Sequence, residues 1–245
     1  MITNNSILKW IVILPLIFVI LFSCKKDKNN YTTAPVMSYP KINTETYVYG
    51  GNSSTETYSY NSNGRIFLLT QSDGSFIKYE YSNNKLIMEH YQSGGSLLYT
   101  AFNKINSLGL VVSDSMSSSY SKYEYDVNGY LIKELNYNNG ILTDSSIYTI
   151  FNGNTISVTR NNLTTTYLYT VEYFTDKSNT IGNENKGIGF WGKQSTNLVK
   201  SVAYSIVGQG QLSLEEYTYE FDINGRVSRQ TITGDPGYTT FTYND

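Results

Sequence analysis

The sequence predicts a single all-β domain, an antiparallel meander of about 14 strands curled into a barrel or roll. Polar and apolar residues alternate with a period of two through most of the chain, and no window with a helical period of useful length interrupts them. The composition agrees, because Tyr (24), Gly (19) and few Pro (4) are typical of strands joined by tight turns. A hairpin motif also recurs along the chain, and closure into a barrel would hide the sheet edges.

The first 43 residues lie outside the expected domain. Lys9 precedes an uncharged apolar run over residues 10–22. This run is too short to cross a bilayer as a helix, which predicts a cleaved signal peptide over residues 1–23. Residues 24–43 are rich in Lys, Asn, Thr and Pro and are expected to form a flexible tether. The domain itself is expected over residues 44–245.

Cys24 is the only cysteine and follows Leu-Phe-Ser. This stretch resembles a bacterial lipobox, which implies that Cys24 is lipidated and anchors the protein to a membrane. The alternative is an ordinary signal peptide with an incidental cysteine. By the same resemblance, Lys25 favours the outer membrane. Residues 25–28 resemble export tags imperfectly, so surface-exposed and periplasm-facing positions both stay open.

Segments with a period of two occur in the following order, with turn residues between them. They cover residues 46–49, 57–60, 66–70, 76–81, 86–91, 97–102, 109–112, 123–125, 130–137, 141–151, 155–159, 163–174, 198–207, 212–221, 227–232 and 238–243. A Ser-rich loop is expected over residues 113–119. Residues 176–197 form the longest stretch without a strand pattern.

The recurrent motif is Tyr-x-Tyr/Phe-Asn/Asp-x-Asn-Gly, with full copies in residues 58–64, 123–129 and 219–225. The two aromatic residues share one face of a strand. Asp126 is a side-chain acceptor for a type I turn, and Gly129 suits the left-handed position of a bulged hairpin. The copies are unequally spaced, so the motif predicts a reused hairpin and not a solenoid.

This motif resembles the tyrosine-aspartate (YD) repeats of bacterial cell-surface and toxin-shell proteins. Taken with the lipobox and the segment Phe-Trp-Gly-Lys-Gln-Ser-Thr-Asn-Leu-Val at residues 190–199, the sequence resembles a family of Bacteroidota lipoproteins of unknown function with a porin-like fold. The resemblance covers residues 45–245. The resemblance implies a fold and a location in the cell envelope, and it implies no biochemical activity.

Charge and patterning argue against nucleic acid and against a membrane-embedded barrel. Without Lys9 the chain has 17 Lys and Arg against 20 Asp and Glu, and no basic patch with interleaved aromatic residues. A lipid-facing strand needs an apolar outer face. Residues 77–81 and 217–221 instead place Lys or Glu opposite their Tyr face, so a water-soluble barrel is expected.

No catalytic or metal-binding pattern emerges, and we expect neither an enzyme nor a cofactor. His90 is the only histidine, whereas a zinc site needs several His or Cys ligands, so a solvated strand position is expected. Glu215 and Glu216 are adjacent and face opposite sides of a strand, unlike a glycosidase pair. Distant carboxylates could still converge. The Asp-x-Asn-Gly turns lack the further ligands of a calcium loop.

The candidate ligand or partner surface is the irregular segment, with Phe190, Trp191 and Lys193 as its residues. The alternative is a plug that closes one end of the sheet. The tyrosines are expected to stack across strands, with stacking on sugar rings as the alternative. The sequence therefore predicts a non-catalytic outer-membrane or cell-surface lipoprotein that acts as a structural or interaction module with a glycan or protein partner. The alternative is a glycan-binding lipoprotein of a polysaccharide uptake system.

Overall fold

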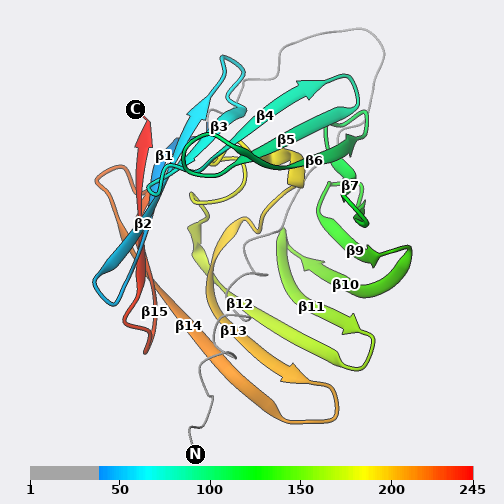
Figure 1. The fold of residues 1–245 in the computed structure, drawn as a ribbon. Coiled ribbons are helices and arrows are strands. Elements are labelled where there is room, and N and C mark those ends of the chain that lie inside the picture. The colour runs from blue at the N-terminus through cyan, green and yellow to red at the C-terminus, as the bar shows by residue number, and fades with distance from the viewer. Residues whose placement is uncertain (1–38, 245) are drawn as a thin grey trace, which may run out of the picture.

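A computed structural model describes residues 39–244 of the 245-residue chain, and in this part sixteen antiparallel strands form a closed barrel (Figure 1). Every strand pairs with its sequence neighbours, and β1 pairs with β16 to close the ring. The elements are β1 Lys41–Tyr49, β2 Asn52–Tyr60, β3 Ile66–Gln71, β4 Phe76–Ser82, β5 Lys85–Tyr91, β6 Leu97–Ile105, β7 Val111–Met116, β8 Ser119–Tyr125, β9 Leu131–Asn138, β10 Ile141–Phe151, β11 Asn154–Asn162, β12 Thr166–Ser178, the 3₁₀ turn η1 Gly189–Trp191, β13 Asn197–Ile206, β14 Gln211–Phe221, β15 Val227–Ile232 and β16 Tyr238–Asn244.

The predicted all-β antiparallel meander is confirmed, and of the barrel and the roll that the sequence left open the closed barrel is observed. The expected strand number of about 14 was close to the sixteen observed. The expected loop over residues 113–119 was wrong, because this segment is the β7–β8 hairpin. Asp114 explains the difference. Its carboxylate accepts hydrogen bonds from the Ser121 amide (2.9 Å) and the Tyr123 hydroxyl (3.1 Å), so a Ser-rich strand is held in register by an inward-facing carboxylate.

The recurrent motif forms the turns that the sequence predicts. In the central copy, Gly129 N–H donates to the Asp126 carbonyl (3.0 Å), and the Asp126 carboxylate accepts the Tyr130 amide (2.7 Å). Gly129 has a φ of 85°, which is strained for other residues. Asn61 and Asp222 cap the same turn, and Asn106 caps a fourth copy that the sequence motif did not single out.

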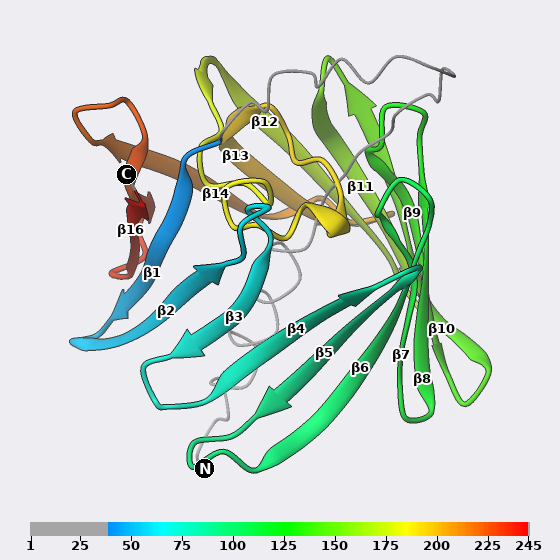
Figure 2. The same cartoon turned by 90° about the horizontal axis from the view of Figure 1, so that it is seen from above.

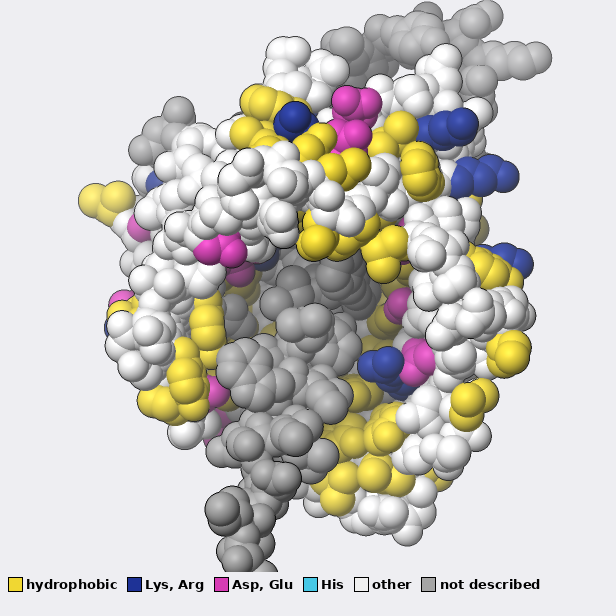
Figure 3. Space-filling view, in the orientation of Figure 1, with side chains coloured by type: hydrophobic (Ala, Val, Ile, Leu, Met, Phe, Trp, Pro, Cys, Tyr) yellow, Lys and Arg dark blue, Asp and Glu magenta, His cyan; other side chains and the backbone are white. Residues whose placement is uncertain are grey.

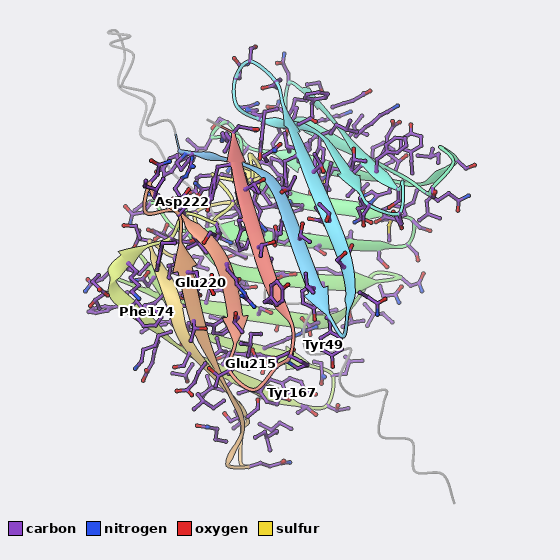
Figure 4. The ribbon with its side chains drawn as sticks, turned by 90° about the vertical axis from the view of Figure 1, so that its left-hand side faces the viewer. Tyr49, Tyr167, Phe174, Glu215, Glu220 and Asp222 are labelled. Atoms are coloured by element: carbon purple, nitrogen blue, oxygen red, sulfur yellow. The ribbon has the colours of Figure 1, made fainter. Side chains whose placement is uncertain are left out.

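All four turns lie at the end of the barrel where the odd-numbered strands begin, which we call the closed end. Figure 4 shows Asp222 at this end and Tyr49 toward the opposite, open end. Seven deeply buried apolar side chains are the first or second residues of odd-numbered strands, and they form a ring at the closed end. They are Ile42, Ile66, Leu86, Val111, Leu131, Leu198 and Val227.

Tyrosine hydroxyls join the even-numbered strands to the start of the preceding odd-numbered strand. Each hydroxyl donates to a backbone carbonyl of that strand, so a buried acceptor is satisfied without interrupting the sheet. We call these six bonds the tyrosine ring. They run from Tyr60 to Ile42 (2.6 Å), Tyr81 to Ile66 (2.9 Å), Tyr125 to Val111 (2.6 Å), Tyr173 to Thr155 (2.8 Å), Tyr219 to Val199 (2.9 Å) and Tyr243 to Val227 (2.8 Å).

The outer face of the barrel carries charged and polar side chains among exposed apolar ones such as Phe102, Ile147 and Leu214. Cross-strand ion pairs lie on it, including Lys133 with Glu124 (2.8 Å) and Lys200 with Glu172 (2.9 Å). Successive residues of a strand point to opposite faces of the sheet. Tyr123 and its cross-strand partner Glu134, which are next to the Glu124–Lys133 pair, therefore point into the interior of the barrel, which we call the lumen. An outer wall with paired charges in mid-strand is suited to water and not to lipid. Within residues 39–244 no helix is long and apolar enough to cross a bilayer.

The tyrosine ring predicts the effect of removing one hydroxyl. Tyr125→Phe should lower the free energy of unfolding by about 1–3 kcal/mol, because the Val111 carbonyl is buried and loses its side-chain donor. Urea denaturation followed by tryptophan fluorescence measures this change. The matched control is Tyr120→Phe, since Tyr120 stacks on Tyr137 on the outer face and should change stability by less than about 0.5 kcal/mol. Equal stability of the two variants would contradict the role of the ring.

Candidate binding site

Residues 179–196, here called the plug segment, connect β12 to β13 and lie across the closed end, shown in yellow in Figures 1 and 2. Backbone hydrogen bonds join the segment to strand starts around the ring, which fixes its path. They run from Ile42 N–H to Asn185 O (3.0 Å), from Ile66 N–H to Gly187 O (3.2 Å), from Thr196 N–H to Gly153 O (3.0 Å) and from Lys193 N–H to Gly129 O (3.5 Å).

The three predicted site residues, which all lie in the plug segment, differ in their burial and in their neighbours. Phe190 is only 7% exposed, with its ring 6.2 Å from Tyr79 and 6.1 Å from Tyr81. Trp191 is half-buried and packs edge-on against Tyr123 at 5.4 Å. The Lys193 ammonium lies 5.4 Å from the Tyr130 ring centre. Phe190 is therefore part of the core. This position agrees with the alternative from the sequence analysis, in which the segment closes one end of the sheet as a plug.

A small hollow lies at the closed end beside the plug segment, lined by Lys41, Arg65, Leu108 and Glu184 among others. Lys41 Nζ donates to the Glu184 carbonyl (2.6 Å). Burial raises the pKa of the Glu184 carboxyl, although the charges of Lys193 and Lys41 oppose this shift. Burial likewise lowers the pKa of Lys41, with Glu184 opposing. The hollow is therefore lined by two cationic side chains, Lys41 and Arg65, and one carboxyl, that of Glu184.

A network of polar side chains lines the lumen over β8–β11. Ser121 Oγ donates to Asn136 (2.6 Å), and Asn136 Nδ2 donates to Glu134 (3.1 Å) and more weakly to Asp144 (3.4 Å). Asp144 in turn accepts from Arg160 Nε at 2.6 Å. Each carboxylate is held by neutral or cationic donors, so the wall presents fixed acceptors to the lumen.

The structure also brings together two carboxylates that the sequence did not pair. Glu45 and Glu56 lie directly opposite each other on β1 and β2, and the Tyr58 hydroxyl is 2.9 Å from both. Lys186 of the plug segment forms an ion pair with Glu45. Burial and both carboxylates raise the pKa of Tyr58 well above its usual range. From the sequence, the pair could have been found only by deducing the register of the hairpin that β1 and β2 form.

Aromatic rings gather on the lumen wall toward the open end. The Tyr204 ring lies 5.8 Å from Tyr167 and 5.2 Å from Tyr169. The rings of His90 and Tyr99 stack at 4.1 Å on β5 and β6, which are seven strands away in the ring of sixteen and therefore nearly opposite. Figure 3 shows the molecule hollowed on one face, with apolar side chains at the rim and charged ones on the wall.

His90 lies within a strand as expected, and its side chain is half-buried. It faces the lumen, where Tyr99 covers its ring, and burial lowers its pKa. Asp126 and Asp222 are turn caps as expected. In the described part of the chain no group of three or more His, Cys, Asp or Glu residues is placed to hold a metal ion. Cys24, the predicted lipidation site, lies outside the described residues.

The plug segment predicts a steric test at Gly187. A Cβ there would lie 2.6 Å from the Tyr60 ring and 2.9 Å from the Ile66 amide nitrogen. Gly187→Ala should therefore destabilise the barrel by about 1–3 kcal/mol more than Gly225→Ala. Gly225 is the matched control, because its φ (74°) is close to that of Gly187 (71°) while its Cβ would meet nothing within 4 Å. Equal midpoints in urea would contradict the close packing of the plug segment.

Glu184 predicts a pH dependence of stability. Its folded-state pKa is raised above the usual 4.5, so its favourable contribution is complete below that pH and is lost as the pH rises through the folded-state pKa. Glu184→Gln does not titrate. Its free energy of unfolding relative to the wild type should therefore increase as the pH rises through the folded-state pKa of Glu184 and level off above it. Urea denaturation at pH values from 4 to 8 measures the difference, and a constant difference would contradict the burial of this carboxyl.

Comparison with known proteins supports the fold. No family model and no curated protein matches the sequence. A porin-like protein from Bacteroides uniformis ATCC 8492 is similar in structure, with a TM-score of 0.67 and 15% identity over 84% of this chain and 98% of that one. A porin-like protein from Bacteroides vulgatus ATCC 8482 has a TM-score of 0.54 and 12% identity, covering 84% and 99%. At these identities the likeness shows a shared barrel fold and no shared activity.

Proposed function

We propose that this protein is a non-catalytic lipoprotein of the outer membrane, held by acyl chains on Cys24, and that its barrel is a structural or interaction module. The lipobox at residues 21–24 supports the anchor, and the Bacteroidota lipoproteins that the sequence resembles support the address. The barrel shared with porin-like Bacteroides proteins agrees with a place in the cell envelope. Because the outer wall carries ion pairs, we assign membrane anchoring to the acyl chains on Cys24 and not to the barrel.

The observation that carries the interaction role is a division among the inward-facing tyrosines. Those of the tyrosine ring use their hydroxyls to hold the closed end together. Toward the open end, the hydroxyls of Tyr99, Tyr169 and Tyr204 make no hydrogen bond within residues 39–244. Partly exposed rings with unused hydroxyls are suited to contact a partner that enters the lumen.

The carboxylate pair Glu45 and Glu56 supports a structural interpretation more than catalysis. A general acid needs a carboxyl that is kept protonated by an apolar environment. Glu45 instead pairs with Lys186, and both carboxylates accept the Tyr58 hydroxyl. These contacts occupy oxygens that a substrate would need, so we assign the pair to holding β1, β2 and the plug segment.

The anchor is tested by metabolic labelling with a clickable fatty acid. The wild-type protein should be labelled and recovered in the outer-membrane fraction, whereas Cys24→Ala should lose the label, because acylation requires the thiol. Labelling that persists in Cys24→Ala would overturn the anchor. Protease treatment of intact cells then distinguishes the two faces of the outer membrane, since only a surface-exposed protein is digested.

A second candidate function is glycan binding within a polysaccharide uptake system. The specific observation in its favour is the cluster of Tyr167, Tyr169 and Tyr204 beside the Arg160–Asp144 pair. Aromatic faces next to fixed hydrogen-bonding groups are the chemistry that a sugar ring requires, because it has apolar faces and a hydroxyl edge.

A further inference from the structure

We infer that the lumen wall over β10–β13 is a saccharide-binding subsite, in which a sugar ring stacks on Tyr204 and Tyr169 while its hydroxyls accept hydrogen bonds from Arg160, which Asp144 holds in place. We call it the tyrosine–arginine wall. The inference rests on the second candidate function and gives it a location, a ligand class and named residues. Neither residues 190–193 nor the closed-end hollow takes part in it.

The first step of the argument is that the rings are placed and accessible. Tyr169 and Tyr204 are direct cross-strand partners on β12 and β13, and their rings are tilted by 42°. Tyr167 stacks on Tyr204 at 19° and completes a surface of three rings. All three side chains are half-buried, so their rotamers are restricted while part of each ring stays open to the lumen.

The second step is that a charged pair lies beside the rings. Arg160 on β11 is the register partner of Tyr167 on β12 and also lies opposite Ser146 on β10. Its Nε is bound to Asp144, but the side chain is 37% exposed, and its terminal N–H groups make no hydrogen bond within the described part of the chain. The pair therefore offers the terminal N–H donors of Arg160 in an orientation that Asp144 fixes.

The third step is the choice of ligand class. Lipid chains would cover Arg160 and Asp144 without replacing their hydration, which costs free energy. A peptide would need pockets for alternate side chains, whereas this wall presents a surface of rings with a polar border. Saccharides match both parts at once. The stacked His90 and Tyr99 on the nearly opposite wall provide a second aromatic surface for a chain of sugars that crosses the lumen.

The experiment uses the mature chain from residue 24 with Cys24→Ser, so that binding is measured without acyl chains. Native affinity electrophoresis in gels containing laminarin, xylan or galactomannan gives the retardation and its dissociation constant. At least one polysaccharide should retard the protein. Tyr204→Ala should weaken that binding at least tenfold, because it removes the central ring of the surface.

The matched control is Tyr137→Ala. Tyr137 also lies in a stacked tyrosine pair, with Tyr120 at 4.5 Å, but this pair is on the outer face. Its variant should bind within twofold of the parent chain. Arg160→Lys keeps a cation near Asp144 and removes the planar fork, so binding should weaken about fivefold. This variant decides the question if Tyr204→Ala fails to fold, as judged by its thermal unfolding midpoint.

Two results would overturn the inference. One is the absence of retardation by all three polysaccharides, which would leave a protein partner as the function of the lumen. The other is retardation that Tyr204→Ala and Arg160→Lys leave unchanged, which would place binding elsewhere. Both are independent of the proposed anchor, because loss of fatty-acid labelling in cells would disprove the lipoprotein while leaving binding by the unlipidated chain intact.

Discussion

The tyrosine ring is the interaction on which the rest of the barrel depends. A sixteen-stranded barrel has a wide interior, and 206 described residues provide too few apolar side chains to fill it. The chain therefore concentrates its core at one end. There, six tyrosine hydroxyls bind carbonyls at the starts of odd-numbered strands, and the same rings cover the buried aliphatic residues beneath them. Packing and hydrogen bonding are thus supplied by one residue type.

Exceptions to the ring show that the position matters more than the residue. On β6 the equivalent donor is Asn103, whose Nδ2 binds the Leu86 carbonyl at 3.1 Å. In the third copy of the motif, Phe221 replaces the second tyrosine and has no hydroxyl. Tyr219, two residues earlier on the same face, binds Val199 instead. At the starts of seven of the eight odd-numbered strands, a side chain of the following even-numbered strand donates to a backbone carbonyl, and β9 is the exception.

Much of this architecture could be predicted from the sequence, because turns and strand periodicity are local. Asp126 and Asp222 were predicted as turn residues, and their oxygens do accept the amides of the return strand. The lumen wall could not be predicted in the same way. Tyr137 and Tyr204 occur in similar alternating patterns, yet one lies outside the barrel and the other inside. Periodicity defines two faces of a strand, and only closure of the sheet decides which is inner.

The same reasoning supports placing the proposed binding site at the open end rather than at the plug segment. A ligand that displaced Phe190 would have to break the core against Tyr79 and Tyr81, together with the backbone bonds of the plug segment to the strand starts. At the open end the rings and the Arg160–Asp144 pair are already oriented by their own strands, and contact with a ligand breaks no packing. Preorganisation on a rigid sheet therefore favours the lumen wall, while the most distinctive segment of the sequence maintains the fold.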